Sequence, residues 1–294
     1  MNATRPGLGG RLFVALQHLI PQHLLCTLMY RLSRMTWAPL RWALIHGYLG
    51  VIRVNMDEAL EPSPDAYPSL NALFTRALRP DCRPLDPDPG SLVCPVDGTL
   101  SQAGEIREGR IIQAKGHDYS VADLLGPNGR PERYEGGRFA TLYLSPKDYH
   151  RIHMPLTGRL SGMTHLPGRL FSVNALTTEL VPGLFARNER VVCDFETDAG
   201  AMAMVLIGAI FVGGIETVWA GEVTPSRAAG ARATEPEGPV VLERGAEMGR
   251  FNLGSTVVLL FPPGRMDWEA GLTPGRAVRL GERIGALRTP DSAG

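Results

Sequence analysis

Several signatures that would assign this 294-residue chain directly are missing from it. The formal net charge is zero, which removes the basic surplus typical of a nucleic-acid-binding protein. The four cysteines include no Cys-x-x-Cys pair and lie at no metal-ligand spacing from a histidine. We therefore expect reduced thiols in a cytosol-facing protein, although the sequence alone allows one disulfide. The chain also lacks internal repeats, a Gly-x-Ser-x-Gly nucleophile motif and a dinucleotide-binding or pyridoxal signature.

Negative charge is absent from the first 56 residues. They hold six arginines and no Asp or Glu, whereas the rest of the chain carries six more acidic than basic residues. Apolar residues in this region recur at helical spacing, beginning with Leu12, Leu16 and Leu19, and prolines interrupt the pattern. Trp37 and Trp42 add amphipathic rings. A basic, apolar end on an acidic body predicts contact with an anionic membrane surface.

A clear membrane-spanning run is also missing. Residues 12–30 are uncharged, but Gln, His and Pro occupy their middle, and a spanning helix needs about 20 mostly apolar residues. We predict helices that lie in the membrane interface, with arginines at the lipid headgroups. Helices packed on the protein's own core and a signal peptide without a clear cleavage site are the alternatives. Residues 199–215 are uncharged too, but glycines divide them into strand lengths, which favours buried β-strands.

Composition divides the chain into three regions. Residues 1–56 are predicted to be an amphipathic helical, membrane-associating region, and residues 57–90 a joint and Pro-rich linker with a short helix at 69–78. Residues 91–294 are predicted to form a β-rich catalytic domain, because short β segments bounded by turn residues follow one another there. The fold class is therefore α+β. The predicted strands are 92–96, 99–106, 110–114, 139–144, 158–165, 191–197, 201–212, 215–221, 239–243, 256–261 and 278–280.

The tripeptide Gly254-Ser255-Thr256 joins a small nucleophile to a glycine just before an apolar segment. Glycine takes backbone conformations closed to other residues, so the Ser255 hydroxyl could reach the carbonyl carbon of Gly254. Attack there would convert the amide to an ester, elimination would leave a dehydroalanine, and hydrolysis would give a pyruvoyl group. A lone Gly-Ser-Thr is most often a turn, so the surrounding residues must support this chemistry.

A serine hydroxyl needs a base, and histidine is the usual choice near neutral pH. His150 and His153 lie three residues apart, and Asp97 is suited to orient an imidazole and stabilise its cation. Each also has an ordinary structural interpretation: Asp97 precedes a glycine as in many turns, and a histidine can be a hydrogen-bonded core residue. A third and fourth ligand are missing for a metal site at the histidine pair, so we predict no metal.

Six segments carry a family resemblance when they are taken together. In this order they resemble the phosphatidylserine decarboxylase family in its bacterial, membrane-associated form, from about residue 10 to about residue 285. The segments are Pro95-Val96-Asp97-Gly98-Thr99, Lys115-Gly116-His117-Asp118-Tyr119-Ser120, Asp148-Tyr149-His150-Arg151-Ile152-His153-Met154-Pro155, Leu170-Phe171-Ser172-Val173-Asn174, Gly245-Ala246-Glu247-Met248-Gly249-Arg250-Phe251 and Gly254-Ser255-Thr256.

The resemblance implies a proenzyme that cleaves itself by serinolysis between Gly254 and Ser255. It implies Asp97, His153 and Ser255 as the self-cleavage triad, with Ser255 becoming the covalent pyruvoyl cofactor that forms a Schiff base with the substrate amine. His150 is assigned to protonation or substrate handling, although either histidine remains a candidate for protonating the product. The matching motifs add the substrate-binding candidates His117, Phe171, Ser172 and Asn174.

The implied enzyme is a carboxy-lyase of phospholipid biosynthesis that converts phosphatidylserine to phosphatidylethanolamine and carbon dioxide. The large chain, 1–254, and the small chain, 255–294, would form a heterodimer in one sheet, with further dimerisation left open. The expected partners are phosphatidylserine and an anionic membrane surface, without nucleic acid. The expected location is the cytoplasmic side of the cell membrane, as a peripheral or monotopic protein.

Three other functions fit some of the same residues. A membrane-associated serine hydrolase would use the same triad without cutting its own chain. A non-catalytic membrane-binding module would tolerate loss of the Ser255 hydroxyl. A pyruvoyl enzyme acting on a related serine lipid or a soluble amine would share the self-cleavage but not the substrate.

Overall fold

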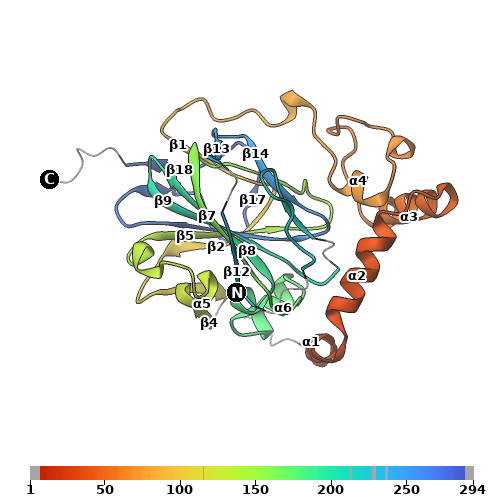
Figure 1. The fold of residues 1–294 in the computed structure, drawn as a ribbon, viewed down its shortest axis with the longest axis horizontal. Helices are drawn as coiled ribbons and strands as arrows, with labels where there is room; N and C mark the ends of the chain where they lie inside the picture. Colours follow the sequence, from red (N-terminus) through yellow and green to blue (C-terminus); the bar gives the residue numbers. More distant parts are fainter. Residues whose placement is uncertain (1–6, 115, 212–213, 227–229, 236–237, 289–294) are drawn as a thin grey trace.

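A computed structural model describes residues 7–114, 116–211, 214–226, 230–235 and 238–288. Three helices come first: α1 Leu8–Leu19, α2 Gln22–Ser33 and α3 Ala38–Val51. They lie along one side of a β-rich body (Figure 1). Prolines set their limits, because Pro21 separates α1 from α2 at a bend of 85° and Pro39 lies in the first turn of α3. The predicted α+β class with N-terminal helices is confirmed.

A large antiparallel sheet forms the centre of the body. Its strand order is β12-β7-β8-β9-β15-β5-β2-β17, and β13 also pairs with β7. The apolar run that we expected to be strands rather than a membrane helix supplies β9. The strands are β2 Gly98–Glu105, β5 Arg138–Leu144, β7 Gly158–Leu166, β8 Arg190–Thr197, β9 Gly200–Ile207, β12 Arg232–Thr234, β13 Val241–Leu242, β15 Ser255–Phe261 and β17 Ala277–Val278.

Smaller sheets pack around the large one. One has the order β11-β10-β14-β6, another β1-β18-β16, and β3 pairs with β4 as a hairpin. The strands β4, β6, β11, β14, β16 and β18 were not predicted, since each has at most five residues and most interrupt their apolar residues with charged ones or glycine. The strands of the smaller sheets are β1 Ser91–Val93, β3 Arg110–Ala114, β4 His117–Ser120, β6 Arg151–His153, β10 Ile215–Thr217, β11 Gly221–Glu222, β14 Glu247–Phe251, β16 Met266–Trp268 and β18 Arg283–Leu287.

Short helices fill the connections. Their starts follow local capping: the Ser69 hydroxyl accepts the amide of Ala72, and the Asn174 side chain accepts the amide of Thr177. The short helix predicted at 69–78 is therefore present but ends earlier. These helices are α4 Leu70–Phe74, α5 Val121–Leu125, α6 Ala175–Leu180 and α7 Leu184–Arg187, with 3₁₀ turns η1 Pro64–Ala66, η2 Pro80–Cys82 and η3 Pro131–Tyr134.

The central strand β15 is buried along its whole length. Val257 and Leu259 point into one core cluster, shared with β6 and β14, whereas Val258 and Leu260 point into a second cluster, shared with β4 and α5 to α7. Cover on both faces explains why this strand reads as a continuous apolar run. The strand begins at Ser255, so the predicted cleavage site lies at one end of the central sheet.

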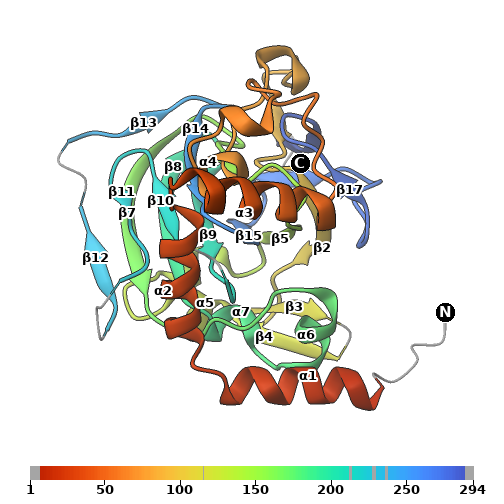
Figure 2. The same ribbon diagram turned by 90° about the vertical axis from the view of Figure 1, so that its right-hand side faces the viewer.

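The N-terminal helices bury polar residues and expose apolar ones. Gln17 is only 2% exposed, and its amide oxygen accepts the backbone N–H of Ser172, whereas Leu19 is 81% exposed. Gln22 is likewise buried and accepts the N–H of Leu170. In Figure 2, α1 and α3 run across the view, and α2 connects them along the front of the body. Among the described residues no single helix is long and apolar enough to cross a membrane, while α1 and α2 meet that criterion only as a bent pair.

Candidate active site

The predicted scissile bond lies where the backbone is strained. Leu253 has φ 137° and Gly254 has φ 49°, both in the range that L-residues with side chains rarely adopt. A Cβ atom on Gly254 would meet nothing within 4 Å, so backbone conformation and not space favours glycine there. Ser255 then enters β15 opposite Leu144, the last residue of β5. The strain therefore ends at the residue whose hydroxyl is the predicted nucleophile.

The Ser255 side chain is fully buried, and its Oγ lacks a hydrogen-bond partner in the part of the chain that the structure describes. A buried hydroxyl without a partner costs free energy, on the order of 1–3 kcal/mol. Such exceptions are rare enough to need an explanation. Thr141 and Thr256 share this feature, so it is compatible with a reactive hydroxyl at Ser255 without identifying one.

His150 lies beside the same segment. The backbone N–H of Phe251 donates to the His150 carbonyl at 3.0 Å, and β5 ends opposite Ser255 only six residues before His150. The His150 Nδ1 lies 2.8 Å from the Asp148 carbonyl, so Nδ1 carries the proton and Nε2 is an acceptor. That Nε2 is buried and finds no donor among the described residues. Burial lowers the pKa of His150 to about 3, so its ring is neutral at pH 7.

His153 lies on β6, where its amide donates to the Pro95 carbonyl at 2.9 Å. Its Nδ1 is 2.8 Å from the Gly245 carbonyl, which fixes the proton on Nδ1. Its Nε2 is 3.1 Å from the Tyr149 hydroxyl, which must then be the donor. Burial lowers the pKa of His153, and the charge of Asp97 opposes this only weakly. The ring is therefore a neutral base whose accepting nitrogen is occupied by Tyr149.

Asp97 is held by other partners in this structure. Arg83 binds it through two nitrogens, with Nη2 at 2.6 Å from Oδ2 and Nε at 2.9 Å from Oδ1, and the N–H of Leu280 adds a bond of 2.8 Å to Oδ1. The same Arg83 Nη2 lies 2.7 Å from Glu58. Asp97 lies two residues after Pro95, whose carbonyl accepts the backbone N–H of His153. Among the described residues, the side chains of Asp97 and His153 form no hydrogen bond with each other.

Gly98 explains how Asp97 comes to this end of the sheet. A Cβ atom on Gly98 would lie 2.3 Å from the Tyr143 carbonyl oxygen, so only glycine allows β2 to approach β5 this closely. Thr99 pairs with Tyr143, and Tyr143 pairs with Thr256 on its other side. Thr99, Tyr143 and Thr256 are thus paired side by side across three strands. Asp97 lies two residues before Thr99 and Ser255 one residue before Thr256, at the same end of the sheet. The Asp97-Gly98 pair is a close strand contact and not merely a turn.

Known proteins are similar in sequence to this chain over almost its whole length. The family model described as phosphatidylserine decarboxylase matches residues 70–286, and a second model, described as PSD, matches residues 12–49. The chain belongs to the phosphatidylserine decarboxylase family. A "Phosphatidylserine decarboxylase proenzyme" of Bordetella avium is 53% identical over 277 residues, which cover 93% of this chain and 94% of that protein. Proteins of the same name from Azotobacter vinelandii and Methylococcus capsulatus are 52% and 48% identical, over 94% and 95% of this chain and 98% and 97% of theirs.

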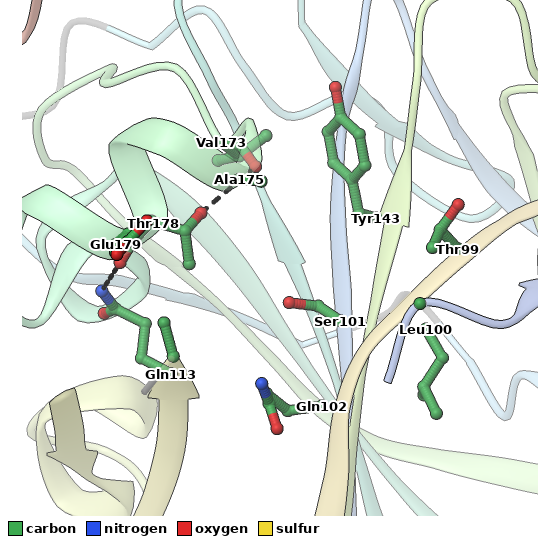
Figure 3. A pocket seen from close by; sticks show the side chains of 12 residues that line it. Thr99, Leu100, Ser101, Gln102, Gln113, Tyr143, Val173, Ala175, Thr178 and Glu179 are labelled. Carbon is green, nitrogen blue, oxygen red and sulfur yellow. Dashed lines mark hydrogen bonds between the residues drawn. The ribbon is translucent and has the colours of Figure 1, made fainter. Parts of the chain in front are cut away.

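A cavity of about 400 Å³ lies between β2, β5 and the segment that leads into α6. Figure 3 shows Tyr143 and Thr99 on one wall, with Val173 and Thr178 across from them. Tyr143 pairs with Thr256, so the cavity lies on the face of β15 opposite to the one that carries the Ser255 side chain. The cavity is lined mainly by hydroxyl, amide and apolar groups, with Glu179 as its acidic residue.

None of the four substrate-binding candidates is among the described residues that line this cavity, although their neighbours Val173 and Ala175 are, and each candidate has structural partners of its own. Phe171 is fully buried in the second core cluster, and Asn174 caps α6. The amide of Ser172 donates to Gln17 of α1. His117 pairs with Ala114, which lines the cavity. Their roles toward substrate remain predictions. Lys115 of the same motif lies outside the described residues.

Sequence reasoning missed a group of residues in the predicted linker. Phe74 packs against His150 with 4.1 Å between ring centroids and the rings tilted by 44°, Arg83 binds Asp97, and the Thr75 carbonyl accepts from Arg151 at 2.9 Å. Residues 57–90 thus build one wall of the site in addition to joining the helices to the sheet. Their only sequence signal was the mixture of apolar and basic residues between Leu70 and Arg83.

Proposed function

We propose that this protein is a pyruvoyl-dependent phosphatidylserine decarboxylase that matures by cutting its own chain between Gly254 and Ser255. Its relatives are named phosphatidylserine decarboxylase proenzymes, which supports both the substrate and the processing. The observation that carries the self-cleavage is the complete burial of Ser255. In the uncut chain an external ester or peptide cannot reach this hydroxyl, so burial argues against a serine hydrolase and favours attack on the chain's own backbone.

The proposed cleavage balances within the chain. The Ser255 oxygen bonds to the Gly254 carbonyl carbon, the peptide C–N bond breaks, and the nitrogen gains the proton that the hydroxyl loses. Elimination then removes the Cα proton of residue 255 and breaks its Cβ–Oγ bond, which releases the Gly254 carboxylate. Water hydrolyses the resulting enamine through its imine tautomer to ammonia and a pyruvoyl group. His153 serves as the proton acceptor in the first step, with Asp97 as its anionic neighbour.

The residues present fit a pyruvoyl group at position 255. The unpartnered Ser255 Oγ lies at the first residue of β15, where a small keto-acyl group is no larger than the serine that it replaces. When formed, this group supplies an electron sink for loss of carbon dioxide from a bound amino acid headgroup. The neutral His150 ring, packed against Phe74, gives the carboxylate apolar surroundings and leaves Nε2 free to accept and return a proton.

The function is tested by incubating the purified, matured protein with phosphatidylserine in nonionic detergent micelles. We expect carbon dioxide and phosphatidylethanolamine in equal amounts, and loss of activity after treatment with phenylhydrazine, which reacts with ketones. Release of fatty acid or of free serine instead would identify a hydrolase. Turnover that phenylhydrazine leaves intact would exclude the pyruvoyl group while retaining the decarboxylation.

We also infer that α1 to α3 lie on the cytoplasmic face of the cell membrane. The apolar side chains turned to solvent support this inference, because an ordinary soluble helix would bury them and expose its glutamines. Arg34 departs from the expected headgroup role, since it pairs with Glu222 at 2.6 Å and stacks on Tyr30. The large exposed apolar residues of these helices and their links include Leu8, Leu12, Phe13, Leu16, Leu19, Leu24, Leu28, Met35, Trp37, Trp42 and Val51.

Replacing Leu12 and Leu16 by glutamate is expected to release the protein from vesicles. Each buried leucine contributes about 1.5–3 kcal/mol to apolar transfer, so the double variant should lose at least about tenfold in partitioning. The measurement is co-sedimentation with vesicles that contain phosphatidylserine. Leu60→Glu is the matched control, because Leu60 is also exposed but lies outside the helices. Equal loss for control and double variant, or no loss for either, would contradict this orientation.

A further inference from the structure

Arg76 is a buried cation without an anion. Its side chain is only 5% exposed, yet its guanidinium forms no hydrogen bond or ion pair with any residue that the structure describes. The Nε atom is completely buried and unpartnered. Burial lowers the pKa of Arg76, while Tyr48, Tyr67 and the more distant charge of Asp97 act in the opposite direction. Removing a charge from water without pairing it is among the most costly arrangements in a folded protein.

The buried guanidinium belongs to the active-site wall. Phe74, two residues earlier, packs against His150, and the carbonyl of Thr75 accepts from Arg151. The charge of Arg76 acts directly on His150, whose pKa it helps to lower. The segment 74–76 therefore runs alongside 150–151, and Arg76 lies within electrostatic range of the histidine beside the cleavage site.

The nearby carboxylates already bind other groups of the protein. Asp97 is bound twice by Arg83, Glu247 lies 2.8 Å from Arg151 Nη1, and Asp148 accepts the amide and hydroxyl of Ser145. None of them forms an ion pair with Arg76 within the described ranges. The anion that would complete this site must therefore come from outside the protein.

We propose that Arg76 binds the phosphodiester of the phospholipid substrate while the serine headgroup reaches position 255. This inference rests on the proposed function. The substrate carries two anionic groups, and only the phosphodiester keeps its charge throughout the reaction. A cation on the carboxylate would stabilise the reactant more than the transition state, because that charge is lost as carbon dioxide leaves. The geometry therefore assigns the arginine to the phosphate.

The position of α3 is consistent with a lipid arriving from the membrane. Tyr48 of α3 donates to the Pro146 carbonyl at 2.5 Å and packs edge-on against Phe74 at 6.1 Å between ring centroids. Trp42 and Val51 of the same helix are exposed. The helix α4, which Arg76 follows in the chain, lies next to α3 (Figure 2).

The test compares matured Arg76→Met and Arg76→Lys with the wild type and with Arg79→Gln, which removes a charge three residues away at an exposed position. We expect Arg76→Met to split normally, to melt at the same or a higher temperature because an unpaired buried charge is gone, and to raise KM for phosphatidylserine about 10- to 100-fold. Arg76→Lys should be intermediate, since it keeps the charge without the planar fork. Arg79→Gln should leave KM unchanged.

A second readout separates this inference from the proposed function. Cyanoborohydride reduction traps a soluble amine on the small chain, and the trapped adduct is measured by mass. The wild type should trap glycerophosphoserine in preference to O-ethylserine. Arg76→Met should still trap both amines but without this preference. Wild-type protein that does not decarboxylate phosphatidylserine would defeat the proposed function itself. Unchanged preference and KM in Arg76→Met, or a lower melting temperature with unchanged KM, would overturn the assignment of Arg76.

Two further outcomes also decide the assignment. Inorganic phosphate should compete with glycerophosphoserine only weakly, and competition at equal affinity would instead indicate a site for the free ion. If Arg76→Met does not fold, Arg76→Lys carries the test, and a lysine variant with wild-type KM and preference would overturn the role of the guanidinium fork. Failure of a folded Arg76→Met to split would place the arginine in self-cleavage and equally overturn the proposal.

Discussion

Ser255→Ala is expected to leave the protein as one chain of 31.9 kDa with no decarboxylase activity. The alanine removes the only oxygen that can attack the Gly254 carbonyl from the neighbouring position, so neither the ester nor the pyruvoyl group forms. The wild type should instead give fragments 1–254 and 255–294, the smaller one lighter than its sequence by the loss of one ammonia. Intact-mass spectrometry under denaturing conditions measures both results directly.

Thr256→Val is the matched control for this variant. Thr256 is the next residue, fully buried, and its hydroxyl is also unpartnered within the described chain. Its side chain points to the opposite face of β15, as the alternation of the two core clusters requires. The valine variant should therefore split like the wild type. Splitting of Ser255→Ala at the same bond, or a Thr256→Val chain that stays whole, would show that the nucleophile is not Ser255.

Most strands of the large sheet were predictable because their apolar content is high, whereas the polar strand β12 was not predicted. Val257 to Phe261 are buried on both faces, and burial of that kind leaves a continuous apolar run in the sequence. The strand β6 could not be found in the same way. It is three residues long, carries Arg151 and His153, and exists because it pairs with β14. Its formation is a tertiary effect that local periodicity does not record.

The sequence motifs named residues of the candidate site that lie at one end of the central sheet, but not the contacts that these residues make. Ser255, Asp97 and the two histidines were identified from motifs, and the structure brings all four to one end of the central sheet. That Arg83 binds Asp97 could not be predicted, because the pair joins a Pro-rich segment to the entry of β2 across 14 residues without secondary-structure periodicity. The same applies to Arg76, whose importance lies in a partner that the chain does not provide.

The two histidines differ in a way that affects the assignment of the base. The His150 Nε2 is open, whereas the His153 Nε2 receives the Tyr149 hydroxyl. If His153 takes the Ser255 proton, Tyr149 must turn away or pass a proton through its own hydroxyl. The resemblance to the family favours His153, and the unoccupied nitrogen favours His150. Substitution of each histidine alone separates these two assignments.

His153→Ala is expected to slow splitting by about 10²- to 10⁴-fold, which is the usual contribution of a general base. His150→Ala should still split and should lose decarboxylation instead. His46→Ala is the control, because His46 is a partly exposed histidine of α3 that pairs with Asp65. The measurement is the fraction of intact chain against time after synthesis in a cell-free system. If His153→Ala splits normally and His150→Ala stays uncut, His150 is the base of self-cleavage and His153 the residue needed for decarboxylation.

The pH dependence of wild-type splitting provides an independent check on that base. Burial lowers the pKa of His153, so its imidazole stays neutral below the ordinary histidine pKa of about 6.5. The base form is the active form, and the rate should therefore remain constant as pH falls from about 8 to about 6.5. It should decline only at lower pH, as the folded-state pKa is crossed and His153 becomes protonated. A rate that already declines above pH 6.5 would mean that the base is exposed to solvent or stabilised as a cation, and neither description fits a buried imidazole bound to Tyr149 and the Gly245 carbonyl.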